Sequence, residues 1–128
     1  MFQPRDFLSF AVALQSQLVA SGEPCARTIT SRAYYAAFLA TRQAVRDASG
    51  KPGLDLEHRD LIRRLQSAPD RTLNDLGNRL KTLRDARQSA DYTLGKRWDD
   101  AQARTSAVLA QKFVQLLDST AVPGSLAP

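Results

Sequence analysis

The chain has 128 residues, of which 43% are hydrophobic and 24% charged, and this composition argues for one globular domain and against extensive disorder. The single Cys cannot form an internal disulfide. One Cys and one His are too few ligands for a structural zinc site, so we expect neither a metal nor another cofactor. The formal net charge of +5 favours an anionic partner such as nucleic acid.

The chain contains no candidate membrane segment. Arg, Gln, Asp or Ser interrupts every helical candidate before its apolar run reaches the roughly 20 residues of a membrane span. The N-terminus also lacks the basic and then apolar layout of a secretory signal, because Phe2, Gln3 and Pro4 come first and Asp6 follows Arg5. We therefore expect a cytoplasmic protein with no membrane partner.

The first predicted helix spans residues 5–21. Its apolar residues recur at steps of four, three and four, namely Phe7, Ala11, Leu14 and Leu18. Gly22 offers a stop for this helix, and Pro24 prevents its continuation. The second helix then begins near residues 24–26.

The second predicted helix ends by Gly50, and its stretch Ile29–Asp47 organises the domain. Alanines recur at helical spacing along one side, while larger apolar residues such as Phe38 cover much of the other, so neighbours must pack on several sides. The helix also carries polar side-chain groups such as the Arg32 guanidinium and the Tyr35 hydroxyl. These groups either reach solvent from a central bundle helix or surround a polar site.

A short third helix and a longer fourth helix follow the Gly- and Pro-rich loop at residues 49–55. We predict Asp55 as the N-cap of the third helix, with His58 in its first turn and Pro69 at its end. Asp70 is predicted to cap the fourth helix, whose core stripe consists of Leu73, Leu76, Leu80 and Leu83.

The last predicted helix follows a break near Gly95 and runs to about Asp118, with inner apolar residues spaced by threes and fours. No segment alternates as a strand does, so the predicted class is all-α with about five helices. We predict a single domain over residues 1–118 and a flexible C-terminal tail over residues 119–128. The chain carries no glycine-rich phosphate loop or nucleophile elbow.

The end of the fourth helix carries the residues best suited to a polar site. Arg84, Arg87 and Asp91 are three and four residues apart and share one side, with Tyr92 about 100° further round. An exposed pair of Arg87 and Asp91 would contribute only about 0.2–0.5 kcal/mol. Because Arg87 continues the leucine stripe, we expect its guanidinium to face another helix, where it can bind a carboxylate or a phosphate bidentately.

The segments SRAYYAAF in the second helix and LRDARQSADY in the fourth resemble the HEPN superfamily (higher eukaryotes and prokaryotes nucleotide-binding), particularly its small stand-alone bacterial members with an RxxADY ending. The similarity covers about residues 5–118. It implies an antiparallel bundle of four main helices plus a short one, and a homodimer that brings the polar stretches of two chains together. It also implies a place in toxin–antitoxin or phage-defence systems.

The chain departs from the motif of the active nucleases in that family. There an Arg that steadies the phosphate is followed, after four to six residues, by a His that assists proton transfer at the ribose 2′-hydroxyl. Counted from Arg87, these positions hold Tyr92, Thr93 and Leu94, so the motif His is missing. His58 is remote from Arg87 in sequence and is an accessory candidate only, because a His in a first turn is most often exposed or capping.

The leading hypothesis is therefore a dimeric module that binds RNA, a nucleotide or a partner protein without cleaving it. Arg84 and Arg87, with Arg32, would neutralise phosphates, and Tyr35 would line the cleft as an aromatic surface for a base. Asp91 and Tyr92 complete this predicted site.

Three alternatives remain. In a metal-independent endoribonuclease toxin, Arg87 would stabilise the phosphate and Asp91 or Tyr92 would replace the His, although an ordinary Asp with a pKa near 3.9 is a weak base at neutral pH. From the resemblance, a nucleotidyltransferase-like antitoxin could regulate the protein by nucleotidylating Tyr92. In a purely structural account, the tyrosines pack the core and the RxxADY segment forms an ion pair between helices.

Overall fold

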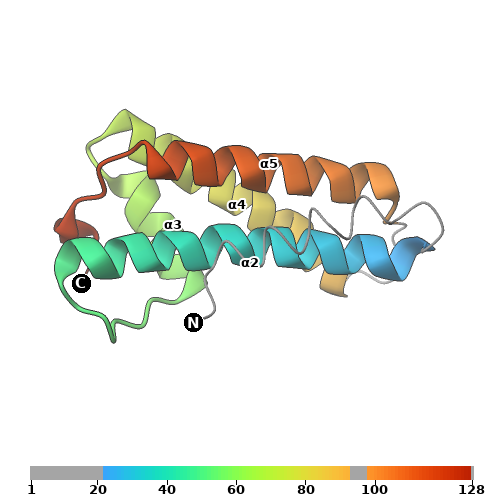
Figure 1. The fold of residues 1–128 in the computed structure, drawn as a ribbon, viewed down its shortest axis with the longest axis horizontal. Coiled ribbons are helices and arrows are strands. Elements are labelled where there is room, and N and C mark those ends of the chain that lie inside the picture. The colour runs from blue at the N-terminus through green and yellow to red at the C-terminus, as the bar shows by residue number, and fades with distance from the viewer. Residues whose placement is uncertain (1–21, 93–97, 128) are drawn as a thin grey trace.

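The computed structural model describes residues 22–92 and 98–127, and within them the chain is all-α, as predicted. The elements in chain order are α2 (Gly22–Ser49), α3 (His58–Ser67), α4 (Arg71–Tyr92), α5 (Asp100–Asp118) and the short 3₁₀ helix η2 (Gly124–Leu126) (Figure 1). The helix predicted over residues 5–21 and the break near Gly95 lie outside the described residues. Within the described part, no helix is both long and apolar enough to cross a membrane.

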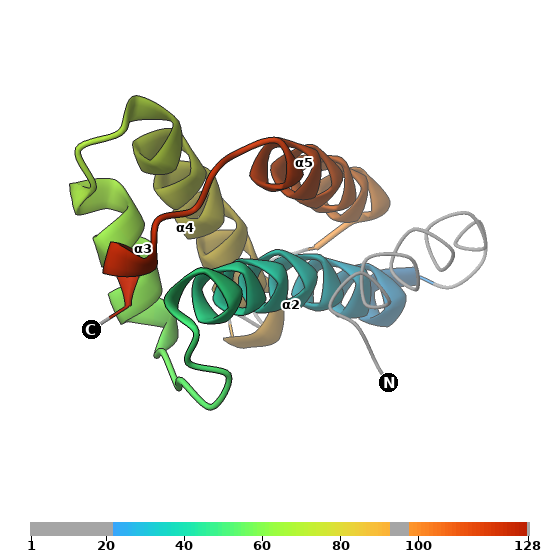
Figure 2. The ribbon, with the colours of Figure 1, turned by 60° about the vertical axis from the view of Figure 1, so that its left-hand side comes forward.

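The three long helices alternate in direction along the chain. In Figure 1, α2 and α5 run the same way from right to left, and α4 runs the opposite way. Helix α2 contacts both α4 and α5, while the short α3 packs on α4 (Figure 2). Helix α2 is therefore the central element of the described residues, as the sequence predicts for its stretch Ile29–Asp47.

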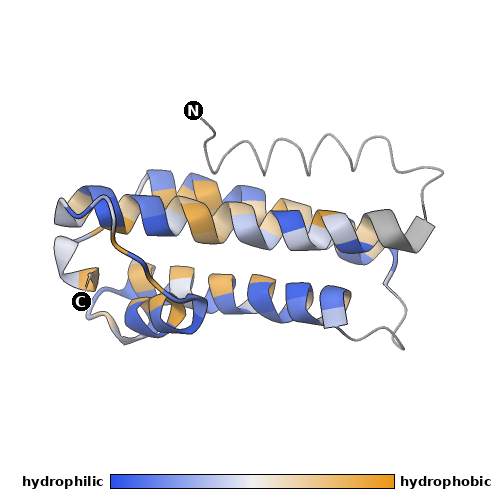
Figure 3. Ribbon diagram, turned by 90° about the horizontal axis from the view of Figure 1, so that it is seen from below, coloured by the Kyte–Doolittle hydropathy of each residue, from blue (hydrophilic) through white to orange (hydrophobic). Residues whose placement is uncertain are grey.

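The core lies between these helices. Hydrophobic residues occupy the faces that the helices turn toward one another, and hydrophilic residues occupy the outer faces (Figure 3). The predicted leucine stripe of α4 is buried in full, and each such side chain contributes about 1.5–3 kcal/mol relative to an exposed one. The largest fully buried apolar and aromatic side chains are Tyr34, Phe113, Ile29, Leu61, Leu65, Leu76, Leu80 and Leu83.

Aspartates cap the two later helices. The Asp70 carboxylate accepts hydrogen bonds from the backbone N–H groups of Thr72 at 2.7 Å and Leu73 at 3.1 Å, which confirms its predicted role at the start of α4. At the start of α5, Asp99 and Gln102 form a reciprocal capping box. Both helix starts are thus defined by local sequence.

The predicted cap of α3 was wrong. Helix α3 begins at His58, its N-cap residue is Glu57, and no side chain provides a cap hydrogen bond. Asp55 lies before the helix because the chain remains non-helical through the next residues and buries Leu56 in the core. As a result, His58 is the first residue of α3.

The C-terminal segment folds back onto the bundle. Leu126, in the segment predicted as a flexible tail, is only 6% exposed and belongs to the main core. Gly124 lies so close to the end of α2 that a Cβ atom there would be 2.8 Å from the Ala48 carbonyl oxygen. The Arg64 guanidinium donates to the Leu126 carbonyl oxygen at 3.5 Å. One leucine and one close-packed glycine thus hold the segment against α2 and α3.

Helix α4 fixes the far end of α3. A Cβ atom on Gly77 would lie 2.8 Å from the backbone nitrogen of Gln66 and 2.9 Å from the Cβ of Leu65, so the two helices touch at this point. The Asn74 side-chain amide donates to the carbonyl oxygens of Leu65, Gln66 and Ala68 at 3.1, 3.0 and 2.6 Å. These contacts hold the C-terminal end of α3 and thereby restrict where His58, at its other end, can lie.

We expect Gly77→Ala to lower the free energy of unfolding by about 1–3 kcal/mol, because overpacking outweighs the gain in helix propensity. Urea denaturation followed by circular dichroism measures the change. Gly53→Ala is the matched control, since a Cβ atom there meets nothing within 4 Å, and its effect should stay within about 0.5 kcal/mol. A Gly77→Ala variant as stable as the wild type would contradict the close contact of α3 and α4.

Candidate functional site

Arg87 lies at the junction of α4 and α2. Its Nη2 donates to the Tyr35 hydroxyl at 2.7 Å and to the Tyr92 hydroxyl at 3.5 Å. The guanidinium carbon lies 5.1 Å from the ring centroid of Tyr35 and 5.5 Å from that of Tyr92, both within cation–π range. Arg87 therefore faces α2, as its place on the leucine stripe predicts, and its side chain is only 16% exposed.

Asp91 joins the same cluster one turn later. Its Oδ2 lies 3.0 Å from Arg87 Nε, and it accepts a hydrogen bond from the Ser31 hydroxyl at 3.4 Å. The Nε atom of Arg87 is buried and has no aligned hydrogen-bond acceptor, so the contact with Asp91 is an ion pair whose N–H does not point at the carboxylate. The carboxylate is thus held between α4 and α2 and compensates part of the charge of Arg87.

Folding brings His58 to the same region. Its ring stacks on Phe38 with centroids 3.9 Å apart and an interplanar angle of 16°, and it meets the Tyr35 ring edge-on at 5.8 Å. Its Nδ1 lies 2.5 Å from the Tyr34 hydroxyl oxygen. The single His of the chain is therefore bound to the double-tyrosine segment of α2, next to the arginines of α4.

Burial keeps both Tyr34 and His58 neutral, and the charge of the neighbouring arginines adds to this effect at His58. Burial lowers the pKa of His58 below its ordinary value of 6.5, and the guanidiniums of Arg87, Arg84 and Arg42 lower it further. Burial also raises the pKa of the Tyr34 hydroxyl above its ordinary value of 10.0, against the opposing effect of Arg84 and Arg87. At neutral pH the positive charge of the site therefore resides on its arginines.

A pocket of about 430 Å³ opens beside His58. Helix α2, the loop before α3, the first turn of α3 and helix α4 all contribute to its lining. Three arginines and two acidic residues are among the lining residues. The lining residues are Phe38, Arg42, Asp55, Leu56, Glu57, His58, Arg59 and Arg84.

The predicted site residues are distributed over this region unequally. Tyr35, Arg87 and Asp91 contact one another directly or through one neighbour, and Arg84 lines the pocket beside His58. Tyr92 is 69% exposed at the end of α4. Arg32 is exposed on α2, next in sequence to the Ser31 that reaches Asp91.

Sequence reasoning placed Arg42 only among the polar ends of the second helix and did not identify Arg59 as a member of the site. A signal for Arg42 exists, because Phe38 and Arg42 follow Tyr35 by three and seven residues and so share its side of α2. Arg59 had no such signal, because its position depends on how the loop before α3 returns to α2. The same dependence explains why His58 was predicted only as an accessory residue.

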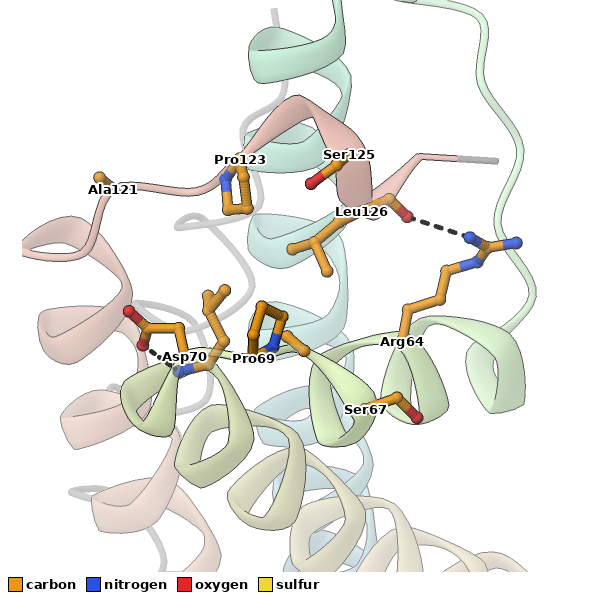
Figure 4. A pocket seen from close by; sticks show the side chains of 10 residues that line it. Arg64, Ser67, Pro69, Asp70, Ala121, Pro123, Ser125 and Leu126 are labelled. Carbon is orange, nitrogen blue, oxygen red and sulfur yellow. Dashed lines mark hydrogen bonds between the residues drawn. The ribbon is translucent and has the colours of Figure 1, made fainter.

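A second pocket, of about 520 Å³, lies between the α3–α4 turn and the C-terminal segment (Figure 4). Its two charged residues already serve the fold, because Asp70 caps α4 and the Arg64 Nη1 donates to the Leu126 carbonyl oxygen. The Leu126 side chain points into the space between the segment and the turn (Figure 4). We interpret this pocket as a packing crevice.

Comparison with known proteins found no family model, no curated protein and no solved structure that matches the chain. Within residues 22–92 and 98–127, no three His, Cys, Asp or Glu side chains lie together as a metal site would require. Function must therefore be inferred from the arginine and aromatic groups described above.

We expect the titration midpoint of the imidazole NMR signals to lie below pH 6.5, and these signals report His58 alone because the chain has one His. A depressed pKa stabilises the fold fully above about pH 6.5, and this contribution is lost as the pH falls from there to the folded-state pKa. The wild type should therefore lose more stability in that window than His58→Gln, which lacks the titrating group. A midpoint at or above 6.5 would contradict the buried setting beside the guanidiniums.

Proposed function

We propose that the chain is a cytoplasmic, HEPN-like module that binds RNA or a nucleotide without cleaving it. The observation that carries this proposal is the setting of Arg87, whose guanidinium is held by the Tyr35 hydroxyl and lies within cation–π range of the Tyr35 and Tyr92 rings. A guanidinium fixed in this way loses little conformational freedom when it binds a phosphate.

The neighbouring residues supply the other parts of a nucleic-acid contact. Arg84 lies one turn before Arg87 and adds a second guanidinium, while the exposed ring of Tyr92 offers a face on which a base can stack. The net charge of +5 adds a long-range attraction for a polyanion. Phosphate contacts would dominate the affinity, which should then depend steeply on salt.

The state of the possible bases favours binding over cleavage. The Asp91 carboxylate is paired with Arg87 and accepts a hydrogen bond from the Ser31 hydroxyl, so it is already engaged in contacts within the fold. The Nδ1 atom of His58 is occupied by Tyr34. A positioned acid or base is usually worth about 10²–10⁴ in rate. A site in which the Asp91 carboxylate and His58 Nδ1 are already engaged is therefore better suited to hold RNA than to cut it.

The resemblance of the SRAYYAAF and LRDARQSADY segments to the HEPN superfamily supports two further parts of the proposal. One is a homodimer in which the arginine clusters of two chains form a common cleft. The other is regulation by a nucleotidyltransferase-like antitoxin that modifies Tyr92, whose side chain is exposed and hence accessible. Both belong to a toxin–antitoxin or phage-defence setting.

A second candidate function is a metal-independent endoribonuclease. The observation that favours it is the position of His58, which contacts the Tyr35 ring while Arg87 binds the Tyr35 hydroxyl, so that an imidazole and a guanidinium share one tyrosine. An imidazole so placed could assist proton transfer at the ribose 2′-hydroxyl next to a phosphate held by Arg87.

We expect a short fluorescent RNA to bind in an anisotropy titration, with an affinity that falls steeply between about 50 and 200 mM salt. Arg87→Ala should weaken binding about 10- to 100-fold, the equivalent of one lost charge-assisted contact of about 1.5–3 kcal/mol. The matched control is Arg79→Ala, because Arg79 also pairs with a helical Asp at 3.0 Å but lies outside the cluster. Equal losses in both variants would indicate a general charge effect, and no binding at either salt concentration would refute the proposal.

Incubation of the protein with the same RNA, followed by denaturing gel analysis, separates the two candidate functions. The binding module leaves the RNA intact. Cleavage that disappears in both His58→Ala and Arg87→Ala, but persists in Arg79→Ala, would instead establish the ribonuclease.

A further inference from the structure

The pocket beside His58 has a composition that the cluster around Arg87 does not explain. Arg42 comes from α2, Arg59 from the first turn of α3 and Arg84 from α4, so three separate segments contribute an arginine to the lining of one pocket. Such convergence is unfavourable for the folded chain unless an anion compensates it. The two carboxylates in the lining, Asp55 and Glu57, offset only part of this charge.

The contact of Tyr34 with His58 decides which ring nitrogen carries the proton. Tyr34 is fully buried, and within the described residues the only hydrogen-bond partner of its hydroxyl is His58 Nδ1. A buried hydroxyl that fails to donate leaves its proton unsatisfied, which costs about 1–3 kcal/mol. Tyr34 therefore donates, Nδ1 accepts, and the proton of the neutral ring resides on Nε2.

This tautomer gives His58 a defined chemical character. Its Nε2 has no hydrogen-bond partner within the described residues, and the residue lines the pocket. The groups that face the ring are Tyr34, Tyr35 and Phe38 of α2 and, by charge, Arg42, Arg84 and Arg87. Stacking fixes the ring plane and the guanidiniums disfavour a second proton. A neutral N–H donor is the result.

We propose that this pocket binds a phosphate group that accepts a hydrogen bond from Nε2–H of a neutral His58 and is neutralised by Arg42, Arg59 and Arg84. Tyr34 is the positioning residue that holds the imidazole in the donor tautomer. The assignment rests on the binding function proposed above and adds to it a phosphate subsite separate from Arg87. His58 is thus a recognition residue here and takes no part in proton transfer.

The size and polarity of the pocket narrow the ligand further. About 430 Å³ exceeds what a phosphate ion needs and lies within the usual range of about 300–1,000 Å³ for small-ligand sites. Ionised carboxylates accept hydrogen bonds and cannot donate them, so Asp55 and Glu57 suit hydroxyl groups attached to the phosphate. The ligand class is a phosphate ester that carries hydroxyls, either a terminal phosphate or an internal phosphodiester of RNA.

The tautomer is tested on the free protein by ¹⁵N NMR of the imidazole. We expect Nε2 to carry the proton and Nδ1 to show the shift of an unprotonated nitrogen. Tyr34→Phe should lose this single tautomer while retaining the ring packing. A wild-type ring protonated at Nδ1 would overturn the proposal.

Titration with inorganic phosphate at about pH 7.5, where phosphate is largely dianionic, tests the pocket through the same imidazole signals. In the variants, binding is followed by the amide signals of the pocket residues. His58→Ala should weaken phosphate binding about tenfold, which corresponds to about 1.4 kcal/mol. His58→Gln should restore most of the loss, because its amide offers an N–H near the position of Nε2. Equal losses in the two variants, or wild-type signals that do not shift with phosphate, would refute the donor role.

A second pair of variants keeps the test independent of the stability of α3. Arg59→Ala should weaken phosphate binding about twofold to fivefold, as expected for one lost charged contact at an exposed position. Arg63→Ala is the control, since Arg63 lies one turn further along α3, is paired with Asp60 and is 69% exposed outside the pocket. Equal effects of the two substitutions would overturn the assignment.

Short RNAs with a 5′-phosphate or a 5′-hydroxyl then distinguish the sources of the phosphate. If the protein prefers the 5′-phosphate RNA and Arg59→Ala abolishes this preference, the pocket binds a terminal phosphate. If both RNAs bind equally well and Arg59→Ala weakens the binding of both to the same extent, the pocket binds an internal phosphate. RNA binding that depends on Arg87 while phosphate leaves His58 unaffected would refute the pocket alone. Phosphate binding at His58 without any RNA binding would refute the proposed RNA-binding function and leave the phosphate pocket in place.

Discussion

The hydrogen bond between Tyr34 and His58 is the interaction on which the candidate site depends. Tyr34 is buried in the middle of α2, and His58 is the first residue of α3, so this single contact ties the start of one helix to the centre of another. At the other end of α3, the Asn74 amide of α4 holds the last carbonyl groups. A short helix fixed at both ends has little freedom to turn, and the stacked ring of Phe38 fixes the plane of the imidazole.

The electrostatics of the site follow from this anchoring. A half-buried imidazole surrounded by guanidiniums remains neutral, so the cationic character belongs to the arginines. The Asp91 carboxylate is paired with one of them, Arg87. The aromatic rings of Tyr34, Tyr35 and Phe38 exclude water from one side, which strengthens each charge contact made there. Fixed guanidiniums beside neutral aromatic donors are suited to holding an anion. They are poorly suited to moving a proton.

Much of this arrangement was predictable from periodicity. The leucine stripe of α4 placed Arg87 against a neighbouring helix, and the alanine and tyrosine stretch of α2 identified the helix that it meets, because both patterns repeat at the helical period. Asp70 was a correct N-cap because capping needs only residues within one turn. Asp55 was an incorrect N-cap prediction, because the chain buries Leu56 in the core before α3 begins at His58.

Local spacing thus sufficed for the all-α class, the central position of α2 and the orientation of Arg87, since each depends on contacts repeated every three or four residues. Two features depended on the tertiary fold alone. His58 reaches Tyr34 across 24 positions of the chain, and Leu126 enters the core although its segment shows no helical period. Both contacts depend on where a non-helical segment returns to the bundle. Packing against distant helices sets that path, and no residue pattern within the loop or the C-terminal segment predicts it.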